Sequence, residues 1–96
     1  MTLTNSTILD SDFRYIDKNG TLLKSRTELS IAQMLTFLGT SYTYENKITL
    51  SNGKTVVVDF KTGDGKLIEV IDSDSDIAKY KEIKSDNLTI MAIGHP

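Results

Sequence analysis

Two short β-branched runs, each interrupted by one carboxylate, constrain the fold of this chain more than any other feature. Asp59 lies within Val-Val-Val-Asp-Phe (56–60), and Glu69 lies within Leu-Ile-Glu-Val (67–70). Such runs are typical of central strands in a sheet. A carboxylate in that setting needs a charged or hydrogen-bonded partner. Because a Gly-rich turn at 62–65 joins the runs, the sequence predicts a hairpin in which both carboxylates converge at the same end.

Convergent carboxylates at the edge of a strand pair are the kind of ligand that a hard divalent cation prefers. Each acid also has a purely structural alternative. Asp59 could accept hydrogen bonds from turn amides, and Glu69 could face outward on an edge strand. These structural interpretations stay open beside the metal-binding one.

Length and charge restrict the classes of protein that this chain can belong to. Its 96 residues predict a single domain, 1–96, with one hydrophobic core. The formal net charge of −2 argues against a protein that mainly coats nucleic acid, because such proteins are visibly basic. The sequence has no Cys, which excludes thiolate metal sites. We expect a cytoplasmic protein without membrane association, since neither a secretion signal nor an apolar run of ~18–20 residues is visible.

The beginning of the chain is weakly patterned. Residues 1–23 predict an N-terminal arm or a small hairpin, in which 13–16 would pair with 21–23. Asn19 and Gly20 would form its turn, because Asn-Gly supplies the positive φ angles of a tight hairpin.

A helix is predicted over about 26–38. It opens with the capping-box pattern Ser25-x-x-Glu28, carries apolar residues at helical spacing, and ends at Gly39. The capping box gives Glu28 a structural alternative, in which its carboxylate bonds to the Ser25 backbone amide.

The remaining residues predict three strands, a second helix and a last strand. The acidic run 72–76 imitates the start of a calcium loop, but Ile77 stands where that loop requires Gly, so a helix start is predicted there. A strand, a helix and a strand at this spacing predict a right-handed parallel crossover. The core, 24–93, is therefore expected to be α/β, in the order α-β-β-β-α-β with a mixed central sheet. The predicted strands are 42–50, 55–60, 66–71 and 88–93, and the second helix extends to about 84.

This order, with Glu28, Asp59 and Glu69 at these positions, resembles the PD-(D/E)xK nuclease superfamily, which includes restriction enzymes and Holliday-junction resolvases. The resemblance covers roughly 24–93 and implies a minimal restriction-endonuclease-like core. It also implies that Asp59 and Glu69 bind Mg²⁺, or Mn²⁺, together with the main-chain carbonyl of Val70. Glu28 would help to hold the metal or its water.

The sequence departs from the family pattern at one position. The lysine that normally orients the attacking water stands two residues after Glu69, where this chain has Ile71. Some members of the superfamily carry the cation on the following helix, which here offers Lys79 and Lys81. Lys79 is the predicted catalytic substitute, because it lies three residues after Asp76 and could point back toward the sheet. Lys81 stays open as the alternative.

The resemblance implies a small Mg²⁺-dependent endonuclease that hydrolyses phosphodiester bonds in DNA. Since a chain of this length has little room for a separate DNA-reading element, specificity would come from a homodimer or a partner protein. The change at Ile71 and the acidic composition favour an alternative, a catalytically degenerate nuclease-fold protein that binds DNA or protein. A third class is a small α/β interaction protein whose acids are only caps and edges, and low metal affinity would distinguish it from a nuclease.

Overall fold

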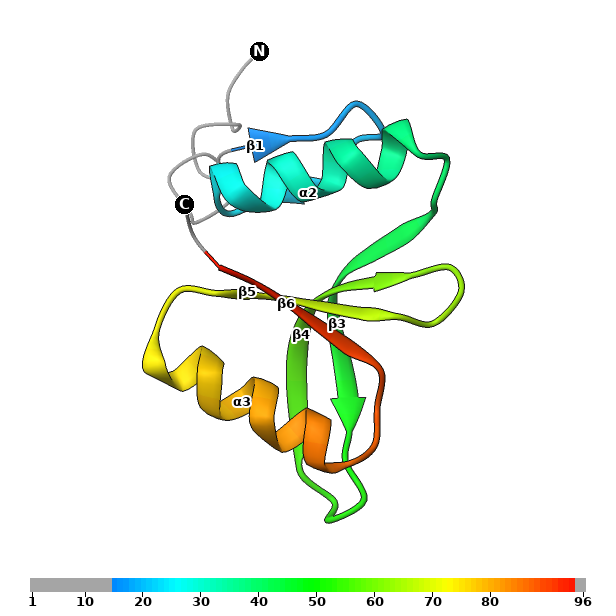
Figure 1. The fold of residues 1–96 in the computed structure, drawn as a ribbon. Helices are drawn as coiled ribbons and strands as arrows, with labels where there is room; N and C mark the ends of the chain where they lie inside the picture. The colour runs from blue at the N-terminus through cyan, green and yellow to red at the C-terminus, as the bar shows by residue number, and fades with distance from the viewer. Residues whose placement is uncertain (1–14, 95–96) are drawn as a thin grey trace, which may run out of the picture. The chain divides into compact units, whose positions relative to one another are not determined.

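The computed structural model describes residues 15–94. The chain divides into two compact units, Met1–Gly39 (unit 1) and Thr40–Pro96 (unit 2), and each is described by itself. From the first described helix onward the elements follow the predicted α-β-β-β-α-β order (Figure 1). Neither helix within the described range is long and apolar enough to cross a membrane. The division into an arm (1–23) and a core (24–93) stays a prediction.

Unit 1 begins with a short hairpin. Its strands β1 (Tyr15–Ile16) and β2 (Leu22–Leu23) pair antiparallel. The turn closes through two backbone hydrogen bonds, from Gly20 N–H to the Asp17 carbonyl (2.8 Å) and from Asp17 N–H to the Thr21 carbonyl (2.9 Å). The predicted hairpin is confirmed here, and its residues 13 and 14 lie outside the described range.

The helix of unit 1, α2 (Arg26–Phe37), starts as the capping box predicts. The Ser25 hydroxyl accepts a hydrogen bond from Glu28 N–H at 3.1 Å. The Glu28 carboxylate accepts a hydrogen bond from Lys24 N–H, also at 3.1 Å, one residue before the Ser25 amide that the capping box predicts. Gly39, with φ of 73°, follows the helix, so the predicted range is confirmed to within one residue.

Unit 2 is built on a four-stranded mixed sheet in the order β3-β4-β5-β6. The pairs β3–β4 and β4–β5 are antiparallel, and the pair β5–β6 is parallel. Helix α3 (Asp74–Ser85) makes the connection between the two parallel strands (Figure 1). The predicted mixed sheet and parallel crossover are therefore confirmed. The strands are β3 (Tyr42–Thr49), β4 (Thr55–Thr62), β5 (Leu67–Ile71) and β6 (Ile90–Gly94).

The core of unit 2 lies where α3 packs against the sheet. Ile83 of α3 is fully buried in this core. Because burying one such side chain contributes about 1.5–3 kcal/mol, this cluster fixes the rotation of α3 about its own axis. Its buried members are Leu50, Val56, Val58, Leu67, Ile83 and Ile90.

Strand β3 is irregular in its middle. Glu45 has φ of 58°, a left-handed conformation that is uncommon for a residue other than Gly, Asn or Asp. Beside it, the Asn46 amide donates to the Thr43 carbonyl at 2.9 Å, and the Thr43 hydroxyl donates to the Asn46 side-chain oxygen at 2.6 Å. The register of β3 on β4 places Glu45 opposite Asp59, between two regular pairs.

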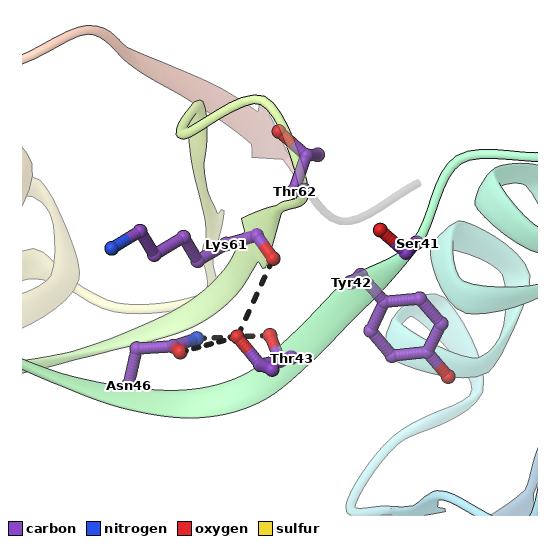
Figure 2. A pocket seen from close by; sticks show the side chains of 7 residues that line it. Ser41, Tyr42, Thr43, Asn46, Lys61 and Thr62 are labelled. Carbon is purple, nitrogen blue, oxygen red and sulfur yellow. Dashed lines mark hydrogen bonds between the residues drawn. The ribbon is translucent and has the colours of Figure 1, made fainter.

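A small pocket opens beside the first residues of β3 and the last residues of β4 (Figure 2). Its volume is about 320 Å³. Gly63 N–H donates to the Ser41 carbonyl at 2.8 Å, which joins the two strand ends. A Cβ at position 63 would meet the Ser41 hydroxyl, which would have to rotate away. The lining includes Ser41, Thr43, Asn46, Lys61, Thr62 and Gly63.

Candidate functional site

The two sequence-predicted carboxylates meet where β4 and β5 separate. These strands pair at two positions, Phe60 with Ile68 and Lys61 with Leu67. The next step of the same register brings Asp59 opposite Glu69, and there the backbone ladder stops. Backbone groups released from a ladder must find other partners when they are buried. At this point the partners are side chains.

The Asp59 and Glu69 carboxylates each accept a hydrogen bond from a backbone amide of the opposite strand. The Asp59 N–H donates to Glu69 Oε1 at 3.1 Å, and the Val70 N–H donates to Asp59 Oδ2 at 2.8 Å. Each carboxylate therefore replaces a backbone acceptor of the missing ladder. The convergence expected from the hairpin is present in the structure.

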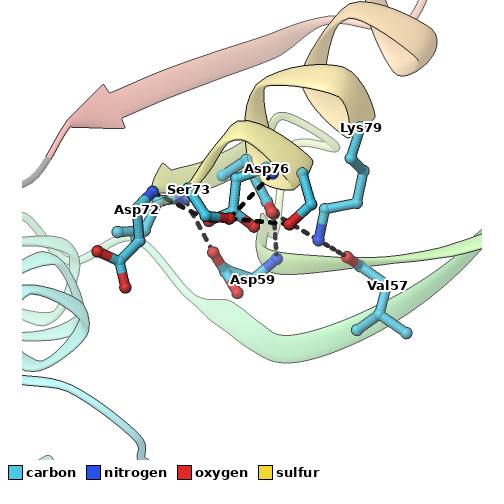
Figure 3. Close-up of polar contacts among 9 residues, drawn as sticks. Val57, Asp59, Asp72, Ser73, Asp76 and Lys79 are labelled. Atoms are coloured by element: carbon cyan, nitrogen blue, oxygen red, sulfur yellow. Dashed lines mark hydrogen bonds and ion pairs between the residues drawn. The ribbon is translucent and has the colours of Figure 1, made fainter.

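Lys79 completes the cluster from α3. Its ammonium nitrogen lies 2.6 Å from Glu69 Oε2 and donates to the Val57 carbonyl at 2.6 Å. Figure 3 shows Lys79 reaching from the helix to Val57, with Asp59 below the start of the helix. Lys79 precedes the buried Ile83 by four residues, so both project from the same face of α3. The packing of Ile83 therefore directs Lys79 toward the sheet.

Lys81 does not share this position. It lies two residues further along α3, its residue is exposed, and its ammonium makes no hydrogen bond or ion pair with residues 15–94. Ile71, at the motif lysine position, is half-buried at the end of β5. The ammonium beside Glu69 thus comes from the helix and from Lys79.

Burial differs among the three charged groups. Glu69 is 1 % exposed, the Lys79 side chain is 25 % exposed, and Asp59 is half-buried. Removing a carboxylate from water is costly unless a counter-charge and hydrogen bonds compensate it. Lys79 and the Asp59 amide supply that compensation to Glu69. Asp59 places a second carboxylate beside this ion pair.

The other two predicted site residues stand differently. Glu28 belongs to unit 1, where it is 7 % exposed and its carboxylate accepts from the Lys24 amide. Val70 joins the cluster through its N–H, whereas the resemblance implies a role for its carbonyl. The catalytic role of Glu28 and the metal-binding roles of Glu28 and Val70 stay predictions.

The donor set is compatible with Mg²⁺. Residues 15–94 hold no group of three or more His, Cys, Asp or Glu side chains that could bind a metal ion by themselves. Mg²⁺, however, commonly uses one or two carboxylates and completes its octahedron with water and substrate phosphate. Asp59 and Glu69 together match that requirement.

The acidic run before α3 acts as a helix start. The Ser73 hydroxyl is the N-cap, accepting from Asp76 N–H at 3.4 Å, and Asp76 Oδ2 accepts from Asp72 N–H at 2.9 Å (Figure 3). These contacts confirm the predicted helix start. They also fix the first turn of α3, and Lys79 projects from the next turn.

The sequence did not identify the backbone groups that complete the site. The Val57 carbonyl and the Asp59 and Val70 amides are held by side chains because the β4–β5 ladder stops after two pairs. No residue type in the sequence shows where the β4–β5 ladder ends. The available signal was the acid within each of the two facing runs, which indicated the carboxylates but not their backbone partners.

Comparisons with known proteins gave no relative whose site could be compared with this cluster. The chain matches no family model, and searches of curated proteins and of solved structures gave no match.

Proposed function

We propose that this protein is a small metal-dependent endonuclease of the PD-(D/E)xK type, which hydrolyses phosphodiester bonds in DNA. The observation that carries the proposal is the meeting of Asp59, Glu69 and Lys79 from two strands and a helix. Lys79 forms an ion pair with Glu69, and Glu69 accepts a hydrogen bond from the Asp59 amide. Separated strands holding two acids, with a nearby lysine, match the pattern that the resemblance implies. The α-β-β-β-α-β order supports the same assignment.

The chemistry of the cluster suits phosphodiester hydrolysis, in which water adds to phosphorus and the bridging oxygen leaves with a proton. Asp59 and Glu69 would hold Mg²⁺ or Mn²⁺, which supplies positive charge to the phosphate when bound. The Lys79 ammonium has one N–H beyond those that contact Glu69 and the Val57 carbonyl, and this donor would serve the attacking water or the negative charge that grows on the phosphate oxygens. In this proposal Lys79 takes the role that Ile71 cannot fill.

The proposal extends to the partners and the location. The substrate is DNA, and a homodimer or a partner protein supplies specificity, because unit 2 devotes most of its residues to the sheet and one helix. The cytoplasm is the proposed location.

A calorimetric titration with Mn²⁺ and then Mg²⁺ tests the proposal on the wild type and on the Asp59→Asn, Glu69→Gln double variant. The matched control is the Asp64→Asn, Glu82→Gln double variant, which has the same chemical changes outside the cluster, at exposed ion pairs with Lys66 and Lys54. Metal binding should be lost in the first variant and retained in the second. A wild type that binds no metal at millimolar concentration would contradict the proposal.

Cleavage of mixed DNA substrates then tests the role of the lysine. We expect Lys79→Met to abolish cleavage and Lys81→Met to retain it, since Lys79 alone of the two contacts Glu69. Equal activity in both variants would remove Lys79 from the chemistry.

One observation favours a second candidate, a catalytically degenerate protein that binds DNA or protein. Glu69 is 1 % exposed, and both of its carboxylate oxygens already have partners. A metal would have to displace or share these contacts. Low metal affinity together with retained DNA binding would establish this candidate.

A further inference from the structure

We propose that the pocket beside Ser41 and Lys61 binds a phosphate group of the DNA strand and so positions the substrate. This inference rests on the proposed function and concerns a subsite outside the Asp59–Glu69–Lys79 cluster. All the residues that form it belong to unit 2.

The pocket has unused hydrogen-bond donors and no acid. The Lys61 ammonium makes no ion pair or hydrogen bond with residues 15–94, and neither does the Ser41 hydroxyl. Asn46 spends one amide N–H on the Thr43 carbonyl, which leaves the other N–H for a ligand. No Asp or Glu lines the pocket. One cation with neutral donors, and no competing carboxylate, is a suitable environment for an oxyanion.

Three other lysines of unit 2 form ion pairs. Lys54 pairs with Glu82 at 3.0 Å, Lys66 lies 3.7 Å from Asp64, and Lys79 pairs with Glu69. Lys61 differs from them because its register partner across β3 is Thr43, a neutral residue. In Figure 2 the Asn46 side chain turns toward Thr43 on its own strand, and the Lys61 side chain extends from the neighbouring strand.

The size of the pocket favours a small group. Its volume of about 320 Å³ is close to the lower limit of ligand pockets, about 300 Å³. That space suits a phosphate with part of its sugar.

The position of Lys61 links the pocket to the cluster. Lys61 follows Asp59 by two residues on β4, so both side chains project from the same face, about 7 Å apart along the strand. One strand of duplex DNA advances about 3.4 Å along the axis per phosphate. A strand whose phosphate occupied the pocket would therefore present a phosphate one or two nucleotides away to the carboxylates.

Salt-dependent binding tests this inference. The affinity of a short labelled oligothymidine and of a short DNA duplex is measured by fluorescence anisotropy across a KCl series, with Ca²⁺ in place of Mg²⁺. The variants are Lys61→Gln and, as a matched control, Lys47→Gln, which removes the same charge from an exposed position of the same hairpin. For Lys61→Gln the slope of log affinity against log salt should fall by about 0.7–0.9, the value for one lost phosphate contact. The control should change it by much less.

An unchanged slope for Lys61→Gln, or an equal change for Lys47→Gln, would overturn the inference. Amide chemical shifts of Ser41 and Gly63 on addition of the oligothymidine provide a second readout, and the absence of any shift would also count against it. Mn²⁺ titration and DNA cleavage by the wild type separate the two proposals. If the wild type binds metal and cleaves DNA while the slope stays unchanged, only the phosphate pocket fails. If the slope falls but the wild type neither binds metal nor cleaves, the pocket stands and the nuclease function fails.

Discussion

The Lys79 ammonium lies 2.6 Å from the Glu69 carboxylate, and this ion pair joins helix α3 to the most deeply buried acid of the sheet. The pair has two partners of unequal exposure, since Glu69 is 1 % exposed and the Lys79 side chain is 25 % exposed. Loss of the lysine would therefore leave a buried charge, whereas loss of the acid would leave one that can reach water. Because of this asymmetry, the contribution of the ion pair to stability can be measured by substituting each partner.

We expect Lys79→Met to destabilise the protein by about 2–4 kcal/mol, somewhat below the full cost of breaking a buried pair because Lys79 is partly exposed. Urea unfolding measures the change, with Lys81→Met as the control that should stay within about 0.5 kcal/mol. Combining Lys79→Met with Glu69→Gln should recover part of the loss, because the buried charge is then absent. A Lys79→Met variant as stable as Lys81→Met would show that the ion pair contributes nothing.

Two substitutions at Asp59 should separate folding from metal binding. Asp59→Asn keeps a side-chain oxygen for the Val70 N–H and should cost less than about 1 kcal/mol, whereas Asp59→Ala leaves that amide without its acceptor and should cost about 1–3 kcal/mol. Both variants should lose metal affinity in calorimetry. If Asp59→Asn unfolds the protein while metal binding by the remaining folded fraction is intact, Asp59 is structural.

The left-handed backbone at Glu45 gives a prediction about strain. Glu45→Gly and Glu45→Ala both remove the interactions of the Glu45 side chain. The difference in stability between the two variants therefore reports the backbone conformation. Gly should be more stable than Ala by about 1 kcal/mol, because φ of 58° is unfavourable for a residue with a Cβ. Chemical denaturation measures this difference in stability. An Ala variant at least as stable as the Gly variant would contradict the left-handed conformation at position 45.

Asp64 should make stability depend on acid pH. A hydrogen bond from the Thr62 hydroxyl, aided by the nearby Lys66 charge, lowers the pKa of Asp64 below its ordinary value of 3.8. A lowered pKa in the folded state stabilises the fold above pH 3.8, and this contribution is lost as the pH falls through the lowered pKa. Unfolding midpoints between about pH 2 and 5 should fall less steeply for Asp64→Asn than for the wild type.

Carbon-13 titration of the Asp64 carboxyl supplies the control for that prediction. The Thr62→Val variant should return the pKa toward 3.8, because it removes the hydroxyl donor. An unchanged titration in Thr62→Val would assign the lowered pKa to Lys66.

The fold could be predicted from local patterns to a large extent. The capping box at Ser25 and the turn at Gly20 are short-range signals, and each one appears in the structure where the sequence placed it. The β-branched runs around Asp59 and Glu69 likewise became β4 and β5.

The site could be predicted only in part. The two acids follow from their unusual surroundings, but the early end of the β4–β5 ladder depends on the paths of whole strands. Lys79 was preferred to Lys81 because it lies three residues after Asp76. Whether its side chain reaches Glu69 depends on the rotation of α3, which the burial of Ile83 sets.

The short ladder between β4 and β5 has a spectroscopic consequence. The amide protons of Asp59 and Val70 are held by carboxylates, whereas a continued ladder would have given them backbone carbonyls. A carboxylate can bind a proton or a cation in place of the amide, whereas a backbone carbonyl in a ladder binds either of them far less readily. The hydrogen-exchange rates of these two amides should therefore change when a proton or a cation binds to the Asp59 or Glu69 carboxylate. They can be measured in solution without a label or a substrate.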